Sequence, residues 1–243
     1  MSVKLTVVGC SPAWPNPGGA QSGYLVEGSG RLLLDCGPGV LPRLRETEPW
    51  PLLDAIAITH FHLDHWGDLV PWVWGSMYGP GKANGDRPEL WLPPGGTNEL
   101  EHFGNHFGRP QMFEDAFEIN EYADRTSFRA AGFEVTPTHV LHYELQTYGF
   151  RVMNDRKTLA YSGDSGPCDE LVEVARDADL FLCEATLLRG ELEGALRGHL
   201  DVEEAVDAFH RSGARRLLIT HRPHELPLDG ALEQAEDGLE IDL

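Results

Sequence analysis

The 243-residue sequence predicts an α/β fold in which two half-units of strands and helices stack as a sandwich, with the helices outside. Short apolar runs recur along the chain, and turn residues separate them, which indicates β-strands. Amphipathic helical segments follow the strands in both halves. No linker rich in Pro or Gly divides the sequence, and so residues 1–243 are expected to form a single domain.

In the first half of the chain, apolar runs bounded by Gly and Pro predict strands. Gly28-Ser29-Gly30 lies between two of these runs and predicts a hairpin. Thr97 or Asn98 is the expected N-cap of a helix, because both side chains can accept a hydrogen bond from a free backbone amide. The predicted strands cover residues 4–10, 24–27, 31–35, 54–58 and 89–92, the predicted helices cover residues 40–46, 68–74 and 97–107, and a flexible loop covers residues 78–88.

The second half is predicted to alternate between strands and two helices. Gly213 should end the second helix, because glycine adopts the left-handed conformation of a helix C-terminus. The tail after Arg222 carries acidic residues but no Lys or Arg, and it is expected to form a short surface helix and a loose end. The predicted strands cover residues 117–123, 127–131, 133–141, 148–153, 158–161, 180–183 and 217–220, and the predicted helices cover residues 169–178 and 201–211.

The composition limits the partners and the compartment. The formal net charge is −20, from 19 basic and 39 acidic residues, which disfavours nucleic acid as a partner. The same field disfavours an anionic small-molecule substrate, unless metal cations inside the site overcome it. The N-terminal segment is too short for a signal peptide, and no apolar run reaches the length of a membrane span. A cytoplasmic protein is expected, with a homodimer as one option for its assembly and buried free thiols at Cys10, Cys36, Cys168 and Cys183.

The segment Thr59-His60-Phe61-His62-Leu63-Asp64-His65 follows a predicted strand and contains four potential metal ligands. Imidazole nitrogen and carboxylate oxygen are the usual ligands of zinc and neighbouring first-row ions. In an extended conformation His60 and His62 point to the same side, because side chains alternate with a period of two. Asp64 and His65 would lie on the turn beyond and face a second metal.

Three further polar residues end apolar runs in the same manner as His60. They are His142, Asp164 and His221. Open sheets place their sites just beyond the carboxyl ends of strands. Seven ligands suit two divalent metal ions that share one carboxylate and leave room for water.

These residues resemble the metallo-β-lactamase superfamily. The resemblance rests on residues 59–65, on His142, on Tyr161-Ser162-Gly163-Asp164-Ser165-Gly166 and on Leu218-Ile219-Thr220-His221, and it extends to Asp35 and the strand before it. It implies an αββα sandwich of two mixed sheets with a dinuclear site, usually zinc, although manganese and iron are alternatives. The implied ligands are His60, His62 and His142 for one metal, Asp64, His65 and His221 for the other, and Asp164 as the bridge, with Asp35 as a supporting residue.

Within that superfamily the chain looks most like the branch of ribonuclease Z and the cyclic-nucleotide phosphodiesterases. Cys183-Glu184-Ala185-Thr186 and Gly198-His199-Leu200 resemble stretches of that branch. The resemblance implies that His199 lies near the scissile phosphate as a proton donor, and that Asp64 orients the nucleophile or takes its proton. His139 competes with His142 as the third ligand of the first metal, and the spacing favours His142.

The predicted function is hydrolysis of a small phosphodiester, such as a cyclic nucleotide, by a metal-bridging hydroxide. Ribonuclease Z grips tRNA with a long basic arm, whereas residues 154–157 are too short for one, so tRNA 3′ processing is disfavoured. A lactonase, a thioesterase or a β-lactam hydrolase is the alternative. Four tryptophans lie near the motif in sequence: Trp66, Trp72, Trp74 and Trp91. They would suit such apolar substrates if they lined the site, but tryptophans are also typical of a hydrophobic core or a subunit contact.

Overall fold

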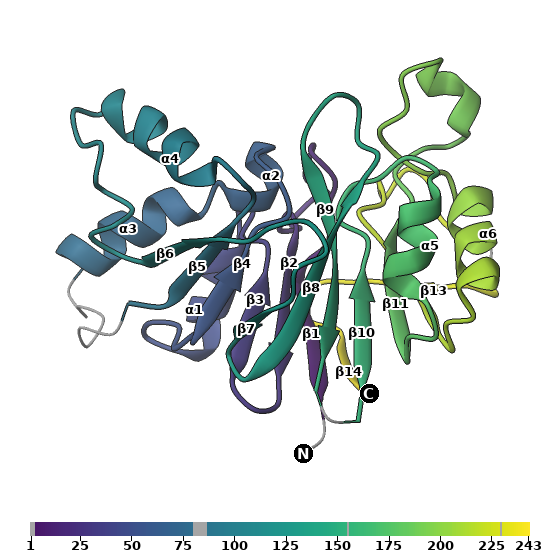
Figure 1. The fold of residues 1–243 in the computed structure, drawn as a ribbon, viewed down its shortest axis with the longest axis horizontal. Coiled ribbons are helices and arrows are strands. Elements are labelled where there is room, and N and C mark those ends of the chain that lie inside the picture. The colour runs from purple at the N-terminus through teal and green to yellow at the C-terminus, as the bar shows by residue number, and fades with distance from the viewer. Residues whose placement is uncertain (1–2, 80–86, 155, 229) are drawn as a thin grey trace.

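The computed structural model describes residues 3–79, 87–154, 156–228 and 230–243. Two β-sheets lie face to face at the centre of these residues, and helices cover the outer face of each sheet (Figure 1). The chain therefore forms four layers in the order helix, sheet, sheet, helix. This arrangement confirms the predicted αββα sandwich.

Sheet 1 is built from the first half of the chain and one strand that returns from the C-terminus. Its seven described strands follow the order β14-β1-β2-β3-β4-β5-β6. Neighbours from β14 to β3 are antiparallel, whereas β3 to β6 are parallel, and the β2–β3 pair is the predicted hairpin. The bounds are β1 Lys4–Gly9, β2 Gly23–Glu27, β3 Arg31–Leu34, β4 Ala55–Ala57, β5 Glu89–Leu92, β6 Glu118–Glu121 and β14 Glu240–Asp242.

Sheet 2 repeats this mixed pattern with the second half of the chain. Its seven described strands follow the order β13-β12-β11-β10-β9-β8-β7. Strands β7 to β10 are antiparallel, and β10 to β13 are parallel. The bounds are β7 Phe128–Ala130, β8 Phe133–Val140, β9 Thr147–Met153, β10 Thr158–Tyr161, β11 Leu180–Glu184, β12 Leu217–Thr220 and β13 Glu233–Gln234.

The helices cover the two sheets separately, with α1, α3 and α4 on the side of sheet 1 and α5 and α6 on the side of sheet 2 (Figure 1). Asp201 and Glu204 form a capping box at the start of α6, and Gly213 ends it with a φ of 72°, as predicted. No helix in the described ranges is both long and apolar enough to cross a membrane. The bounds are α1 Val40–Thr47, α2 Leu63–Trp66, α3 Leu69–Tyr78, α4 Gly96–Asn105, α5 Asp169–Ala175, the 3-10 helix η1 Gly190–Glu193 and α6 Val202–Ser212.

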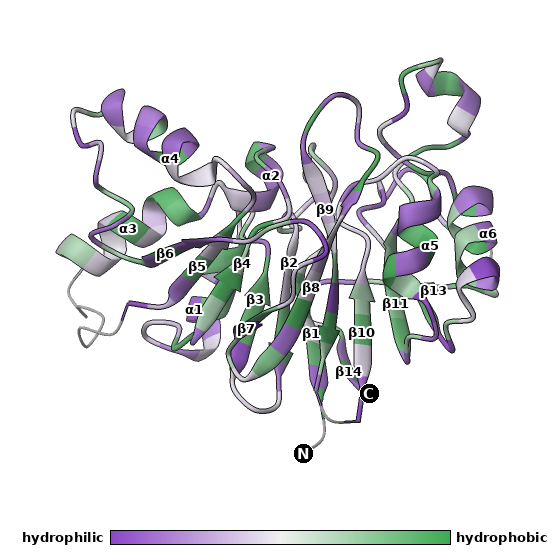
Figure 2. Ribbon diagram, in the orientation of Figure 1, coloured by the Kyte–Doolittle hydropathy of each residue, from purple (hydrophilic) through white to green (hydrophobic). Residues whose placement is uncertain are grey.

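Apolar side chains fill the spaces between the four layers, and the strands are accordingly rich in hydrophobic residues (Figure 2). Leu34 of sheet 1 and Leu218 of sheet 2 belong to one cluster between the sheets. Ile56 packs in a second cluster beneath α3, and Phe181 packs in a third beneath α5 and α6. Strands β4 and β12 are fully buried, as expected for parallel strands that are covered on both faces. Their burial fixes the strand ends from which the candidate site is built.

The C-terminal tail shows that one prediction was wrong. Instead of a surface helix and a loose end, the tail supplies β13 to sheet 2 and β14 to sheet 1. Ile241 lies opposite Leu5 and is buried in the cluster between the sheets, whereas its neighbours Glu240 and Asp242 are exposed. This alternation has the period of a strand. The acidic composition of the tail concealed it.

Two helix ends also differ from the prediction. Helix α4 begins at Gly96, after Gly95 in a left-handed conformation, and not behind a Thr97 or Asn98 cap. The carboxylate of Glu121 accepts hydrogen bonds from the amides of Gly95 and Thr97, so a residue distant in sequence supplies the cap. Helix α5 ends at Ala175 and not at Ala178. Of the predicted loop over residues 78–88, residues 80–86 lie outside the described ranges.

The four cysteines, which all lie in the described ranges, are free thiols as predicted. Cys10, Cys36 and Cys183 are buried, and Cys168 is partly buried. Burial raises the pKa of the Cys36 and Cys183 thiols well above the usual value. These thiols are therefore neutral, which is the form that packs in a core and not the thiolate that binds metals.

Candidate metal centre

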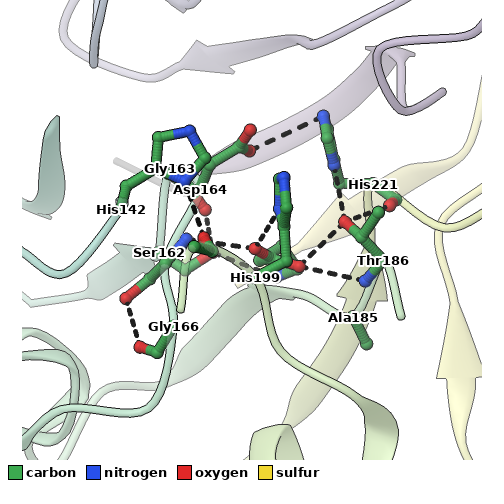
Figure 3. A network of polar contacts seen from close by, with 12 residues as sticks. His142, Ser162, Gly163, Asp164, Gly166, Ala185, Thr186, His199 and His221 are labelled. Atoms are coloured by element: carbon green, nitrogen blue, oxygen red, sulfur yellow. Dashed lines mark hydrogen bonds and ion pairs between the residues drawn. The ribbon is translucent and has the colours of Figure 1, made fainter. Parts of the chain in front are cut away.

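Four strands end at one edge of the sandwich and bring the predicted ligands together. Strand β4 of sheet 1 leads into the Thr59–His65 segment and α2, while β8, β10 and β12 of sheet 2 each end shortly before one polar residue. Figure 3 shows the residues that sheet 2 contributes. The cluster comprises all seven predicted ligands: His60, His62, Asp64, His65, His142, Asp164 and His221.

The ligand atoms of this cluster fall into two groups, in each of which they lie within 4.8 Å of one another. The first group is His60, His62, His142 and Asp164, and the second is Asp64, His65, His221 and Asp164. Asp164 Oδ2 lies 3.8 Å from His60 Nε2, and Asp164 Oδ1 lies 3.2 Å from His65 Nε2. One carboxylate oxygen therefore faces each group, as in a carboxylate that bridges two cations.

Several buried atoms of the cluster have no hydrogen-bond partner in the described part of the chain. They are Nε2 of His60, Nε2 of His65 and both carboxylate oxygens of Asp164. Buried polar atoms are almost always paired, and an orphaned one requires an explanation. Imidazole nitrogen and carboxylate oxygen are suitable ligands for divalent cations. The orphaned atoms and the donor set therefore fit a pair of metal ions.

The protonation states of four candidate ligands also fit metal binding. Burial lowers the pKa of His60, His62 and His142 below the usual value, so their imidazoles are neutral and offer a lone pair. Burial by itself would raise the pKa of Asp64, but the adjacent His65 outweighs it and holds that pKa well below the usual range. Neutral imidazoles and ionised carboxylates are the forms in which these side chains bind metals.

His65 differs from these four ligands in its protonation. Burial would lower its pKa, but the carboxylates of Asp164 and Asp35 outweigh this and raise the pKa well above the usual value. A bound metal would therefore displace that proton.

Asp35 is a fully buried carboxylate behind the ligands of sheet 1. It accepts hydrogen bonds from the Thr59 amide and the Tyr161 hydroxyl at 2.8 Å, and its Oδ2 lies 2.8 Å from His65 Nδ1. The Thr59 hydroxyl, 3.0 Å from Asp35, also lies 3.0 Å from His60 Nδ1. These contacts hold the Nδ1 atoms of both histidines, so that Nε2 is left to face the cluster.

Glu184 is the corresponding buried carboxylate of sheet 2. Its Oε1 accepts a hydrogen bond from the Ser165 amide at 3.0 Å and lies 2.8 Å from His199 Nδ1. Its Oε2 accepts a hydrogen bond from the Thr186 hydroxyl at 2.9 Å. The same hydroxyl oxygen lies 2.9 Å from His221 Nδ1. Each sheet therefore uses a carboxylate to orient one histidine and a threonine to orient another. The carboxylates contact His65 and His199, and the threonines contact His60 and His221.

His199 lies beside the cluster and outside both four-residue groups. Its ring stacks on that of His221, with 5.8 Å between the centroids, and lies 4.9 Å from the ring of His142. Burial would lower the pKa of His199, but the Glu184 carboxylate outweighs it and raises that pKa to about 9. The imidazole is therefore a cation near neutral pH. The ligand atoms of His199, Glu184 and His221 also lie within 4.8 Å of one another, but His199 shares no group with Asp164. The position of His199 beside the cluster and its charge are compatible with a proton donor.

The structure separates the two histidines that competed for one position. His142 is buried in the cluster, and its Nδ1 donates a hydrogen bond to the carbonyl of Gly198 at 2.6 Å. His139 is exposed on β8, where its ring lies against Tyr148. The geometry therefore favours His142 over His139.

Trp66 and Trp72 do not form an apolar wall beside the candidate metals, which was the alternative to the core interpretation. Both are buried in the cluster between sheet 1 and its helices. Trp66 packs against Phe103, and Trp72 packs against Trp50. The core interpretation is therefore confirmed for these two residues.

Sequence reasoning missed the hydroxyl groups that orient the histidines. Thr59 precedes His60 directly, and this adjacency was an available signal. Thr186 and Tyr161 lie far from His221 and Asp35 in sequence, and only the pairing of strands brings them together. No local pattern could have identified their contacts.

Comparison with known proteins agrees with this geometry. Residues 30–222 match the family model described as the beta-lactamase superfamily domain. The chain is 32% identical to the uncharacterized protein Rv1339 of Mycobacterium tuberculosis, over 97% of this chain and 86% of that protein. It is 26% identical to a ribonuclease Z of Myxococcus xanthus, over 99% of this chain and 98% of that enzyme.

A third relative has a solved structure. The probable metallo-hydrolase YhfI of Bacillus subtilis is 30% identical, over 91% of this chain and 88% of that protein. Its crystal structure, described as a metallo-beta-lactamase fold protein, superimposes with a TM-score of 0.85 at 25% identity and covers all of both chains. The chain therefore belongs to the beta-lactamase superfamily, and it is a metal-dependent hydrolase with the metallo-β-lactamase fold.

Proposed function

We propose that the protein is a phosphodiesterase that hydrolyses a small phosphodiester, such as a cyclic nucleotide, at a centre of two divalent metal ions. The observation that carries this proposal is the His199–Glu184 pair beside the two candidate ligand groups. This pair supports the proposal, because a protonated imidazole beside two bound metal ions would be able to give a proton to the oxygen that leaves phosphorus. The relative named ribonuclease Z supports the choice of bond, because a ribonuclease cleaves phosphodiesters.

The residues that would hold the two ions are the three histidines of the first group, Asp64, His65 and His221 of the second, and Asp164 between them. Their nitrogen and oxygen donors admit zinc, manganese or iron, of which zinc is the ion we propose. When bound, two such ions lower the pKa of water and stabilise charge on the attacking and leaving oxygens.

Two side chains are proposed to move protons. Asp64 Oδ2 lies 3.4 Å from His65 Nε2 and 3.2 Å from His221 Nε2, which holds the carboxylate at the second group, where it can orient the attacking water or take its proton. His199 Nδ1 is engaged by Glu184. Its Nε2–H is therefore the group that remains to protonate the leaving oxygen.

The surroundings favour a small substrate over tRNA. Strands β9 and β10 are joined only by residues 154–157, and the Asn154 amide donates a hydrogen bond to the Lys157 carbonyl. No basic arm can be built on so short a connection. The net charge of −20 also opposes a polyanion. His62 is exposed at the cluster, which leaves the candidate centre open to a small molecule from solvent.

Substitution of the shared carboxylate tests the site. Asp164→Ala should lose both ions and reduce turnover by at least about 10⁴-fold, because one oxygen of Asp164 faces each group. Metal content per chain and the turnover rate are the measurements. His142→Ala should lose the first ion, whereas His139→Ala, which alters an exposed histidine on β8, should retain both. Full metal content and turnover in Asp164→Ala would contradict the bridging position.

A substrate panel tests the type of bond. The protein loaded with zinc, manganese or iron is assayed with cyclic AMP, bis-p-nitrophenyl phosphate, an acyl lactone, a thioester and nitrocefin. We expect turnover of the two phosphodiesters. Leu63, which lies between two candidate ligands and is exposed, is the observation that favours an apolar acyl substrate instead. Turnover of the lactone or the thioester alone would overturn the phosphodiesterase proposal.

A further inference from the structure

Glu193, the last residue of η1, is an acidic residue of a surface loop whose carboxylate points inward. Its side chain is only 9% exposed. Oε1 accepts a hydrogen bond from the Tyr143 hydroxyl. Oε2 accepts from the amides of Gly198 at 2.8 Å and His199 at 3.2 Å, and from Arg197 Nε at 3.2 Å. One carboxylate thus joins the loop after β8 to the segment that carries His199.

The backbone segment that Glu193 binds carries His199 and also contacts His142. The Gly198 carbonyl accepts the Nδ1 hydrogen bond of His142, while the Gly198 amide is bound to Glu193. The Tyr143 amide donates to the Arg197 carbonyl at 2.9 Å, so the two segments are also joined through their backbones. Displacement of this segment would move His199 and the acceptor of His142 together.

Tyr143 is held firmly against this segment. It has a φ of 52°, which is uncommon for a residue other than glycine and persists only where the surroundings enforce it. Its ring lies 4.8 Å from that of His142 and 5.7 Å from that of His199. A Cβ atom at Gly198 would lie 2.3 Å from Cζ of Tyr143, so only glycine allows this approach. The hydroxyl of this wedged ring is one of the groups that Glu193 holds.

The charge of Glu193 is balanced locally. Arg197, which donates to Glu193, also makes two hydrogen bonds to Glu204, at 2.9 and 2.7 Å. Glu204 in turn belongs to the capping box of α6. The network therefore runs from a helix terminus, through Arg197 and Glu193, to the backbone beside the candidate centre. A carboxylate suits this position, because its two oxygens can accept four hydrogen bonds at once.

We propose that Glu193 is a positioning residue, which fixes the distance of His199 from the candidate metal centre and thereby controls the turnover rate and not the metal content. This inference rests on the proposed role of His199 as proton donor. Glu193 touches none of the seven candidate ligands; it acts through the Arg197–His199 backbone and Tyr143. Removal of its carboxylate frees this segment and leaves the side chains of all seven candidate ligands in the protein, although the Gly198 acceptor of His142 is no longer fixed.

The experiment compares Glu193→Ala and Glu193→Gln with the control Glu191→Ala. Glu191 is an exposed glutamate on the same 3-10 helix, and its side chain makes no hydrogen bond or ion pair among the described residues. Glu193→Ala should lower kcat by about 10–100-fold with little change in KM, because a displacement of about 1 Å from the reacting geometry costs rate. Glu193→Gln should recover kcat to within about fivefold of wild type, since its amide oxygen still accepts from the Gly198 and His199 amides.

Two readouts are independent of turnover. Metal content should stay at the wild-type value in all three variants. Hydrogen exchange of the Gly198 and His199 amides should accelerate in Glu193→Ala and remain slow in Glu191→Ala. A wild-type kcat in Glu193→Ala, or a loss of metal that parallels the loss of kcat, would overturn the proposal.

The two proposals can fail separately. The kinetic comparison uses whichever substrate of the panel is hydrolysed fastest, so turnover of a lactone alone removes the phosphodiesterase proposal and still tests Glu193. A wild-type protein that hydrolyses no member of the panel would overturn both.

Discussion

Asp35 in sheet 1 and Glu184 in sheet 2 are two buried carboxylates in closely similar surroundings. Each is fully buried, each accepts hydrogen bonds from a backbone amide and a threonine hydroxyl, and each lies 2.8 Å from a histidine Nδ1. The histidines differ in role. His65 beside Asp35 belongs to one of the two groups that share Asp164, whereas His199 beside Glu184 lies outside both and groups only with Glu184 and His221. Under the proposed mechanism, Asp35 supports a histidine that retains a metal, whereas Glu184 supports the proton donor.

The first prediction concerns Asp35 and has the largest expected effect. Asp35→Ala leaves the Thr59 amide, the Tyr161 hydroxyl and His65 Nδ1 without their acceptor in a buried site. We expect a loss of about 3–5 kcal/mol in the free energy of unfolding, as for other broken buried pairs. Metal affinity should fall by about 10–100-fold, because partners of ligand histidines contribute that much. Denaturant titration measures the change in stability, and metal analysis measures the change in metal affinity. Wild-type values in both would show that Asp35 does not support the candidate ligands as proposed.

The second prediction concerns Glu184→Gln, which keeps the shape of the side chain and removes its charge. Metal content should remain at the wild-type value, since Glu184 belongs to neither of the two groups that share Asp164. Turnover should fall by about 10²–10³-fold, in the range that proton transfer by a side chain contributes. The Glu184 carboxylate raises the pKa of His199, so the variant has a lower pKa there. Because the protonated imidazole is the proposed donor, activity should be lost at a lower pH than in wild type as the pH rises.

The outcome for Glu184→Gln decides what distinguishes the two carboxylates. A parallel loss of metal and activity would place Glu184 in the same role as Asp35. An unchanged alkaline limb of the pH–rate profile would remove His199 as the proton donor.

The candidate ligands could be predicted from the sequence, because the pattern that reveals them lies within short segments of the chain. His60 and His62 follow one buried strand with the spacing of an extended chain, and Asp64 and His65 follow them on the next turn. Asp164 and His221 mark the ends of apolar runs that could hardly be anything but buried strands. Such a site depends on where strands end, and apolar periodicity reports strand ends well.

The remainder depends on contacts between segments that are distant in the chain. Glu193 looks like a solvated acid in the sequence, because its partners at Tyr143 and Gly198 come from other loops. Ile241 sits between two acidic residues, and only pairing with β1 shows that it is buried. Burial of the tryptophans beneath sheet 1 likewise follows from α3 and α4 covering that face. None of these facts has a local signature.

The third prediction has the smallest expected effect and compares the two threonines. The hydroxyl of Thr59 lies 3.0 Å from His60 Nδ1, and that of Thr186 lies 2.9 Å from His221 Nδ1. Thr59→Val and Thr186→Val preserve side-chain shape and remove one hydroxyl each. Each should weaken metal binding by about 10-fold, Thr59→Val at the first group and Thr186→Val at the second, because each leaves one ligand histidine without its outer partner. Stepwise metal titration by calorimetry separates the two affinities. If both variants weaken the same step, the two groups are not the independent halves that the shared Asp164 suggests.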